Sequence, residues 1–201
     1  MRWKKLVNSY LLLVVISLTI IALDQVSKAY VREQLHVGQM WMPVEALAPY
    51  LRIVNWYNTG VAFGLFQGMG PIFTILAVLV AIAIVYYFPK ISSQDWIIRI
   101  ALGLQLGGAV GNLIDRVVFG RVTDFVSIGN FPVFNVADAS ITVGVIVLIL
   151  GIWIQDGRQR RELQKQSTEM EIDPPFIKPV DGIKPDFSIN EQTPPNNPPV
   201  I

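Results

Sequence analysis

The sequence contains no cysteine and a single histidine, His36. Without cysteine the protein has no disulfide bonds, thiolate zinc sites, iron–sulfur clusters or cysteine nucleophile. One histidine argues against a histidine-based metal centre and against a histidine-dependent catalytic triad. Any chemistry must therefore use carboxylate, hydroxyl, amide or amine groups, and we expect neither a metal nor a cofactor.

Charge is also scarce, since only 15% of the residues are charged and an ordinary soluble domain has about 25%. The 16 basic and 15 acidic side chains nearly cancel, so no large basic field exists to hold a nucleic-acid backbone. Hydrophobic residues make up 52% of the chain, and the mean hydropathy is +0.47. This composition is typical of a membrane protein, and it excludes nucleic acid as a main partner.

Four long apolar stretches approach the length of about 20 residues that a membrane-spanning helix needs. They are residues 6–23, 71–88, 96–113 and 141–154. The fourth stretch is short, so we expect its helix to begin near Val136. That start places Asp138 in the first turn, at the membrane edge. The sequence therefore predicts an all-α membrane protein built as a four-transmembrane-helix bundle.

The first apolar stretch follows basic residues, which is also the pattern of a cleaved secretory signal. A signal peptide ends in a small-x-small cleavage site, however, and here Asp24-Gln25-Val26 follows the apolar stretch instead. We therefore interpret the first stretch as a retained membrane span.

The basic residues next to the spans predict the orientation of the chain. They are Arg2, Lys4 and Lys5 before the first span, Lys90 and Arg99 on either side of the turn between the second and third spans, and Arg158, Arg160, Arg161 and Lys165 after the fourth span. Four spans place all three groups on one side, which the positive-inside rule identifies as the cytoplasm. We therefore expect both termini in the cytoplasm and the connections 24–70 and 114–135 outside.

The chain becomes hydrophilic after Gln155, and residues 171–201 contain eight of the 13 prolines. Such a segment cannot bury enough apolar surface to offset the entropy lost on ordering it. We therefore predict a four-helix domain over residues 1–155 and a proline-rich, disordered cytoplasmic tail over residues 156–201.

The first outward connection carries a strand pattern. Residues 51–57 mix β-branched and aromatic side chains with polar ones, residues 58–60 are a turn signal, and residues 61–66 resume the apolar pattern. This pattern predicts a small β-hairpin at the outer membrane surface. Four nearby aromatic side chains suit the headgroup zone: Trp41, Tyr50, Trp56 and Tyr57.

Charged side chains at membrane depth are costly, so each one needs a reason. Asp24 and Lys28 are four residues apart on one helical face, where they can form an ion pair. That pair is either a helix-end salt bridge or a support for a functional site. Asp115 stands beside Arg116, and this arrangement predicts a charge-balanced structural pair.

Two acids, Asp124 and Asp138, have no adjacent basic neighbour. Asn135 precedes Asp138 by three residues and is placed to cap the fourth helix. An acid at a helix start commonly only compensates the helix dipole. Two carboxyl groups in one site, however, share a proton near neutral pH and together act as general acid and general base toward water. The pair therefore predicts aspartic protease chemistry.

A serine–lysine nucleophilic pair is the alternative protease chemistry. Ser27 and Lys28 are adjacent, so on a helix their side chains point about 100° apart and cannot readily form a hydrogen bond. The outward connections contain no other lysine. This geometry disfavours the serine–lysine mechanism.

Two functions of other classes compete with proteolysis. A small transporter would use Asp24, Asp115, Asp124 and Asp138 as a proton or cation relay. It predicts acids at all membrane depths and an internal repeat, and the sequence shows neither. A membrane chaperone or scaffold would tolerate the replacement of Asp124 or Asp138 by asparagine, with effects on stability alone.

Five sequence blocks occur in order along the chain. They are residues 24–28 (DQVSK), 58–64 (NTGVAFG), 107–116 (GGAVGNLIDR), 122–125 (VTDF) and 134–138 (FNVAD). In these blocks the sequence resembles the lipoprotein signal peptidases, also called type II signal peptidases. The resemblance covers about residues 10–155 and leaves out the proline-rich tail.

The resemblance implies an aspartic endopeptidase that cleaves diacylglyceryl-modified prolipoproteins just before the lipidated cysteine. By motif match, Asp124 and Asp138 form the catalytic dyad. Seven further residues match positions that bind substrate or support the site: Asp24, Lys28, Asn58, Asn112, Arg116, Asn135 and Ala137. Of these, Asn58, Asn112 and Arg116 are expected to contact the substrate.

The family also implies a small extracytoplasmic β-cradle from the region 51–66. We expect a monomer in the bacterial cytoplasmic membrane, in contact with membrane lipids and with prolipoproteins. Its active site is expected near the outer leaflet, where the lipid-modified substrate meets water.

Overall fold

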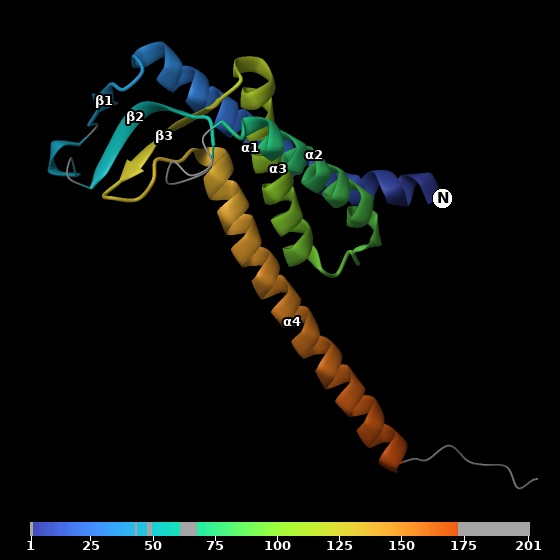
Figure 1. The fold of residues 1–201 in the computed structure, drawn as a ribbon. Coiled ribbons are helices and arrows are strands. Elements are labelled where there is room, and N and C mark those ends of the chain that lie inside the picture. Colours follow the sequence, from blue (N-terminus) through green and yellow to red (C-terminus); the bar gives the residue numbers. More distant parts are fainter. Residues whose placement is uncertain (1, 43, 48–49, 61–67, 173–201) are drawn as a thin grey trace, which may run out of the picture. The chain divides into compact units, whose positions relative to one another are not determined.

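The computed structural model describes residues 2–42, 44–47, 50–60 and 68–172. Four long helices dominate it (Figure 1). They are α1 (Arg2–Gln34), α2 (Gly70–Tyr87), α3 (Trp96–Phe119) and α4 (Val136–Ile172). Two short 3-10 helices, η1 (Glu45–Leu47) and η3 (Phe88–Lys90), lie in the connections.

All four helices contain a segment that is long and apolar enough to cross a membrane. The segments are Tyr10–Gln34, Gly70–Lys90, Trp96–Phe119 and Val136–Thr168. The prediction of four spanning helices is confirmed, and α4 begins at Val136 as expected. α1 and α3 continue beyond their apolar stretches, so the polar residues at their ends lie on helical faces and not in loops.

α4 extends beyond the predicted end of the bundle at residue 155 and reaches Ile172. Residues 158–166 are mostly arginine, glutamine, glutamate and lysine, which are good helix formers, and the first proline after them is Pro174. The described residues up to Gln159 belong to one compact unit, and those from Arg160 onward belong to a second. The predicted disorder of residues 173–201 lies outside the described residues, and the domain boundary stays a prediction.

The small sheet has three antiparallel strands in the order β1-β2-β3. They are β1 (Met40–Trp41), β2 (Leu51–Asn58) and β3 (Val122–Ile128). β2 therefore pairs along its length with a strand from the second outward connection (Figure 1). The hairpin partner predicted at residues 61–66 lies outside the described residues.

The pairing of β2 with β3 has a direct consequence for the candidate acids. Trp56 is opposite Asp124, and Asn58 is opposite Val122. The side chain of Asn58 can therefore reach Asp124, although 66 residues separate them in the sequence. Sequence periodicity alone did not reveal this pairing because a strand's partner is set by long-range packing.

Close packing of α1 on α3 depends on glycine. A Cβ atom at Gly103 would lie 2.9 Å from Ile16, and one at Gly107 would lie 2.7 Å from Ile20. A Cβ atom at Gly111 would lie 2.7 Å from the Oδ2 atom of Asp24. These glycines, spaced four residues apart, thus form a packing surface on α3, and they bring Asp24 against the backbone of that helix.

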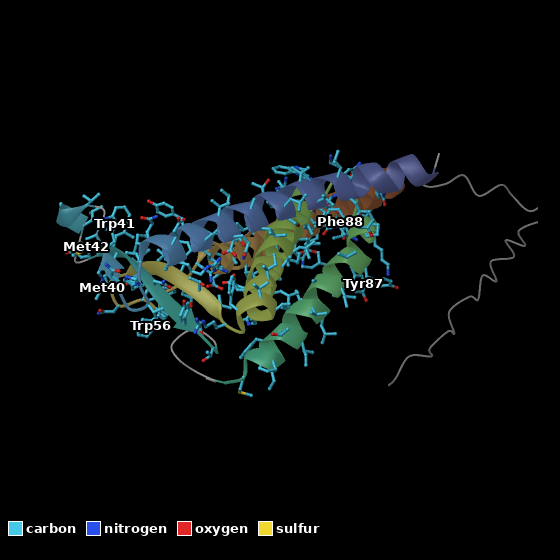
Figure 2. All side chains as sticks on the ribbon, turned by 90° about the horizontal axis from the view of Figure 1, so that it is seen from above. Met40, Trp41, Met42, Trp56, Tyr87 and Phe88 are labelled. Carbon is cyan, nitrogen blue, oxygen red and sulfur yellow. The ribbon has the colours of Figure 1, made fainter. Side chains whose placement is uncertain are left out.

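The apolar and polar side chains are distributed as in a membrane protein. Large apolar side chains are exposed along the helices, while the small buried cluster of Leu13, Ile84 and Phe88 packs with Tyr10 against α3. Figure 2 shows Trp41 and Trp56 on the sheet, where both side chains are about half exposed. The buried side chains at the sheet end of the bundle are mostly polar.

A glycine substitution tests the packing of α3 on α4. Gly108→Ala would place a Cβ atom 2.5 Å from Ser140 Oγ and 2.7 Å from Ile141 Cγ1. Overpacking of this kind costs about 1–3 kcal/mol, so we expect a lower thermal unfolding temperature in detergent. Gly157→Ala is the control because nothing lies within 4 Å of that position. An unchanged unfolding temperature for Gly108→Ala would contradict this packing.

Candidate active site

Two elements bring the candidate acids into one cavity. Asp124 lies on β3, and Asp138 lies in the first turn of α4. Both line a cavity of about 490 Å³, which Asn58, Asn112 and Arg116 also line. Most of the other lining side chains are apolar: Phe73, Val122, Phe131, Pro132, Val133, Phe134, Ile141 and Val143. The cavity is therefore an apolar space with a few polar groups.

The start of α4 fixes the position of Asp138. The backbone N–H of Asp138 donates to Asn135 Oδ1 at 2.9 Å, and the backbone N–H of Asn135 donates to Asp138 Oδ2 at 3.2 Å. These reciprocal bonds form a capping box. The prediction that Asn135 caps this helix is confirmed, and the cap also orients the carboxyl group.

Neutral amides hold both carboxyl groups. Asp124 accepts hydrogen bonds from Asn135 Nδ2 at 2.7 Å and from Asn58 Nδ2 at 2.9 Å. Asp138 accepts one from Asn112 Nδ2 at 2.7 Å, in addition to the backbone N–H of Asn135. Asn135 therefore contacts both acids. Such donors orient carboxyl groups without adding charge to a buried site.

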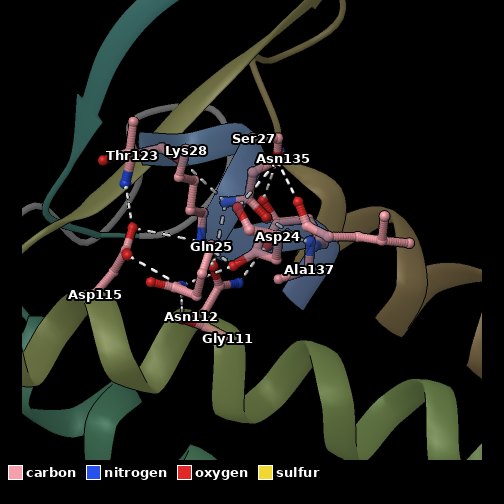
Figure 3. Close-up of polar contacts among 12 residues, drawn as sticks. Asp24, Gln25, Ser27, Lys28, Gly111, Asn112, Asp115, Thr123, Asn135 and Ala137 are labelled. Atoms are coloured by element: carbon pink, nitrogen blue, oxygen red, sulfur yellow. Dashed lines mark hydrogen bonds and ion pairs between the residues drawn. The ribbon is translucent and has the colours of Figure 1, made fainter. Parts of the chain in front are cut away.

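A buried ion-pair cluster lies beside these amides (Figure 3). Lys28 Nζ lies 2.8 Å from Asp24 Oδ2 and 3.4 Å from Asp115 Oδ2, and all three side chains are fully buried. Lys28 also donates to Asn112 Oδ1 at 2.9 Å. The predicted Asp24–Lys28 pair is confirmed, and it contacts the residues that hold the candidate acids.

The predicted pairing of Asp115 with Arg116 is wrong. Asp115 pairs instead with Lys28 and with Arg32, whose Nη1 lies 3.6 Å away, and it accepts the backbone N–H of Thr123 at 2.9 Å. Adjacent residues on a helix point about 100° apart, so Asp115 faces α1 and β3. Arg116 lines the cavity that contains the acids.

Asp24 joins α1 to the start of α4. Its Oδ1 accepts the backbone N–H of Ala137 at 2.9 Å, while its Oδ2 contacts Lys28. Ala137 is fully buried, and its Cβ would lie 3.4 Å from a Cβ atom added at Gly111. This fully buried alanine lies where α1, α3 and the start of α4 meet.

The serine–lysine alternative is excluded by the contacts of both residues. Ser27 Oγ bonds to the carbonyl oxygens of Leu23 at 2.7 Å and Asp24 at 2.9 Å, both on its own helix. Lys28 points instead to the ion-pair cluster and to Asn112. The two side chains face different partners, so the lysine does not activate the serine hydroxyl.

This network also contains three residues for which the sequence predicted no role: Gln25, Arg32 and Thr123. Gln25 donates to Asp24, to Asp115 and to the carbonyl oxygen of Gly111. Arg32 donates to Thr123 Oγ1 at 3.0 Å, and its guanidinium lies over the Phe119 ring. The four-residue spacing of positions 24, 28 and 32 was the available signal for Arg32, because it places all three on one helical face.

The electrostatic environment changes the pKa of Asp124. Burial, and then the nearby carboxylate of Asp138, raise its pKa to about 7. Hydrogen bonds from Asn58 and Asn135 and the positive charge of Lys28 oppose that rise. Asp124 therefore gains or loses its proton near neutral pH, as a group in acid–base catalysis must.

Comparison with known proteins gives consistent matches. The family model described as Signal peptidase (SPase) II matches residues 16–154. Proteins named lipoprotein signal peptidase from Shouchella clausii and Bacillus subtilis are each 36% identical to the chain, over 148 and 151 residues. Each match covers 73% of this chain and 96% of the relative. The protein of that name from Staphylococcus aureus MRSA252 is 33% identical over 153 residues, which are 74% of this chain and 91% of the relative.

Solved structures also resemble this fold. One bacterial membrane enzyme, solved at 2.3 Å, superposes with a TM-score of 0.67 and 31% identity, over 73% of this chain and 90% of the other. A second, solved at 1.9 Å, gives a TM-score of 0.63 and 33% identity, over 70% and 91% of the two chains.

The two neighbouring residues of α3 should differ in their effect on stability. Asp115→Asn removes one acid from Lys28 and presents an amide N–H to existing donors, so we expect a loss of about 3–5 kcal/mol. Arg116→Gln changes a side chain at the cavity and should cost less than about 1 kcal/mol. Unfolding in detergent measures both. Equal destabilisation would contradict the assignment of Asp115 to the Lys28 cluster.

Proposed function

The chain belongs to the signal peptidase II family, and we propose that Asp124 and Asp138 are the catalytic carboxyl groups with which it cleaves signal peptides from prolipoproteins. The family makes it an aspartic endopeptidase. The observation that carries the assignment of the dyad is Asn135, which donates to both carboxyl groups within one cavity. Among the described residues that line this cavity, no other pair offers a nucleophile with an adjacent base.

We infer that the dyad shares one proton at rest. The site has four carboxyl groups, of which Asp24, Asp115 and Asp124 are buried and Asp138 is partly buried. The nearby cations are Lys28, Arg32 and Arg116. With one proton on the dyad, the four carboxyl groups carry three negative charges, which equal the three positive charges. A net charge of zero is favoured where the dielectric constant is low. One carboxylate then removes a proton from the attacking water. The protonated carboxyl group donates its proton to the scissile carbonyl oxygen. The first carboxyl group then gives the water-derived proton to the leaving nitrogen, and the second regains its proton from the diol as the carbonyl group re-forms.

We propose that the scissile peptide binds in the 490 Å³ cavity. Asn58, Asn112 and Arg116 line it beside the dyad and are suited to hydrogen-bond the peptide backbone. The apolar walls are suited to the signal peptide and to the diacylglyceryl group on the cysteine that follows the cut. Asp24, Lys28, Asn135 and Ala137 support these groups from behind.

We propose that the site lies near the outer leaflet of the bacterial cytoplasmic membrane, with both termini in the cytoplasm. Asp138 is at the start of the span Val136–Thr168, and Asp124 lies outside all four spans. The exposed aromatic rings of Trp41 and Trp56 suit the headgroup zone beside them (Figure 2). A monomer contains every residue of the site, and lipid contacts the exposed apolar faces of its helices.

The catalytic assignment predicts the outcome of isosteric substitution. Asp124→Asn and Asp138→Asn should each lower the cleavage rate of a diacylglyceryl-modified prolipoprotein by at least about 10³-fold, because each removes an acid–base group. Asp95→Asn is the matched control. This acid immediately precedes the start of α3, at the opposite end of the helix from the cavity residues Asn112 and Arg116, and it accepts a hydrogen bond from Gln155. Full activity in either dyad variant, with unfolding temperatures unchanged, would contradict the assignment.

The raised pKa of Asp124 predicts a pH dependence. The dyad needs one proton, and a group with a pKa of about 7 loses it as the pH rises through that value. We therefore expect kcat to fall about tenfold per pH unit on the alkaline side of neutrality. Single-turnover cleavage between pH 5 and 9 measures this, with unfolding followed at each pH. A flat profile up to pH 9 would rule out a proton on the dyad as a requirement.

A further inference from the structure

The side-chain amide of Asn112 has a fixed direction. Its Oδ1 lies 2.9 Å from Lys28 Nζ, and a lysine ammonium can only donate a hydrogen bond. The Nδ2 atom must therefore turn the other way, where it donates to Asp138 Oδ1 at 2.7 Å. A chain of two hydrogen bonds thus links the buried ammonium to one carboxyl group of the dyad.

Among the described residues, the other carboxyl group has no such link. Asp124 accepts from Asn58, whose Oδ1 in turn accepts the backbone N–H of Gly60 at 2.9 Å. It also accepts from Asn135, whose Oδ1 accepts the backbone N–H of Asp138. Each acid has two donors in the described part of the chain, and of these donors only the Asn112 amide on Asp138 is backed by a full positive charge. That charge polarises the amide and favours a carboxylate at its donor end.

The secondary structure adds a second difference in the same direction. Asp138 lies in the first turn of α4, where the helix dipole and the free backbone N–H groups favour negative charge. Asp124 lies on a strand, and strands have only small net dipoles. The two acids are therefore not equivalent, although they share Asn135.

We propose that Lys28 is a positioning residue that acts through Asn112, so that Asp138 carries the negative charge of the resting dyad and Asp124 carries its proton. This inference rests on the proposed catalytic dyad and assigns its roles. Asp138 is then the base that removes the proton from water, and Asp124 is the acid that protonates the scissile carbonyl oxygen. The proton released by water remains on Asp138 until it is transferred to the leaving nitrogen. As the C–N bond breaks, Asp124 regains its proton from the diol, which restores the resting dyad.

Lys28 is held in place for this role. It faces Asp24 on its own helix and Asp115 on α3, and both contacts are fully buried. The other charged groups of the site come from α1 (Arg32), α3 (Arg116), β3 (Asp124) and α4 (Asp138). The pKa of about 7 at Asp124 agrees with a proton on that group at neutral pH.

The first test titrates each acid alone, without substrate. Asp124→Asn leaves Asp138 as the single acid, and Asp138→Asn leaves Asp124. The protein is labelled with ¹³C at the aspartate carboxyl carbons, and NMR over a range of pH gives the titration midpoint of the remaining acid in each variant. The signal that is present in one variant and absent from the other identifies that acid. We expect the midpoint of Asp138 to lie at least about one pH unit below that of Asp124. Equal midpoints, or the reverse order, would overturn the proposal.

The second test removes the cation together with its main partner. Asp24→Asn with Lys28→Met keeps the acceptor for the Ala137 N–H and leaves Asp115 with Arg32, Gln25 and Thr123 as partners. In this background we expect the midpoint of Asp138 to rise by about one pH unit and that of Asp124 to rise less. A larger rise at Asp124 would overturn the proposal.

Arg32→Gln is the matched control, because Arg32 belongs to the same cluster but donates to Thr123 and not to Asn112. It lowers the net charge by one, whereas the paired substitution leaves the net charge unchanged. A net-charge effect would therefore make Arg32→Gln the larger perturbation, and that result would overturn the proposal. If the paired variant does not fold, the comparison of the two single acids still decides. Failure of wild-type protein to cleave prolipoprotein would refute the peptidase function separately.

Discussion

A fully buried lysine is the constraint on which the site depends. Removing an ammonium from water costs several kcal/mol, and it is tolerated only when charged and hydrogen-bonding partners surround it. Lys28 obtains those partners from two helices: Asp24 on its own helix, and Asp115 and Asn112 on α3. Each partner then contacts a further element. Asp24 holds the start of α4, and Asp115 holds the start of β3 through Thr123.

This network explains how two acids from distant parts of the sequence come together. β3 and α4 carry Asp124 and Asp138, and each element is attached next to its acid by a carboxylate that also contacts Lys28. Glycines in α3 permit the close approach of α1 that the network requires, since a Cβ atom at Gly111 would collide with Asp24. Helix packing and acid placement are therefore one property of the molecule.

The sequence was sufficient to predict features that depend on local spacing. The four spans follow from apolar length, the Asp24–Lys28 pair from its four-residue spacing, and the Asn135 cap from its position before Asp138. The pairing of β2 with β3 and the partners of Asp115 depend on contacts between distant segments. Local periodicity carries no information about such contacts. The continuation of α4 to Ile172 differs from the prediction of a disordered tail from residue 156. The prolines of residues 171–201 indicate disorder, but the tail residues before them contain no proline and are mostly good helix formers.

If Asp124 and Asp138 form the catalytic dyad, both carboxyl groups must reach the scissile carbonyl group. The most direct measurement is the structure of the protein with a lipidated prolipoprotein peptide whose scissile amide is replaced by a hydroxyethylene group. The hydroxyl of such a group occupies the position of one of the two oxygens of the tetrahedral intermediate. We expect this hydroxyl to lie within hydrogen-bond distance of both carboxyl groups, about 2.5–3.0 Å. A peptide bound with its hydroxyl distant from either aspartate would contradict the assignment of the dyad.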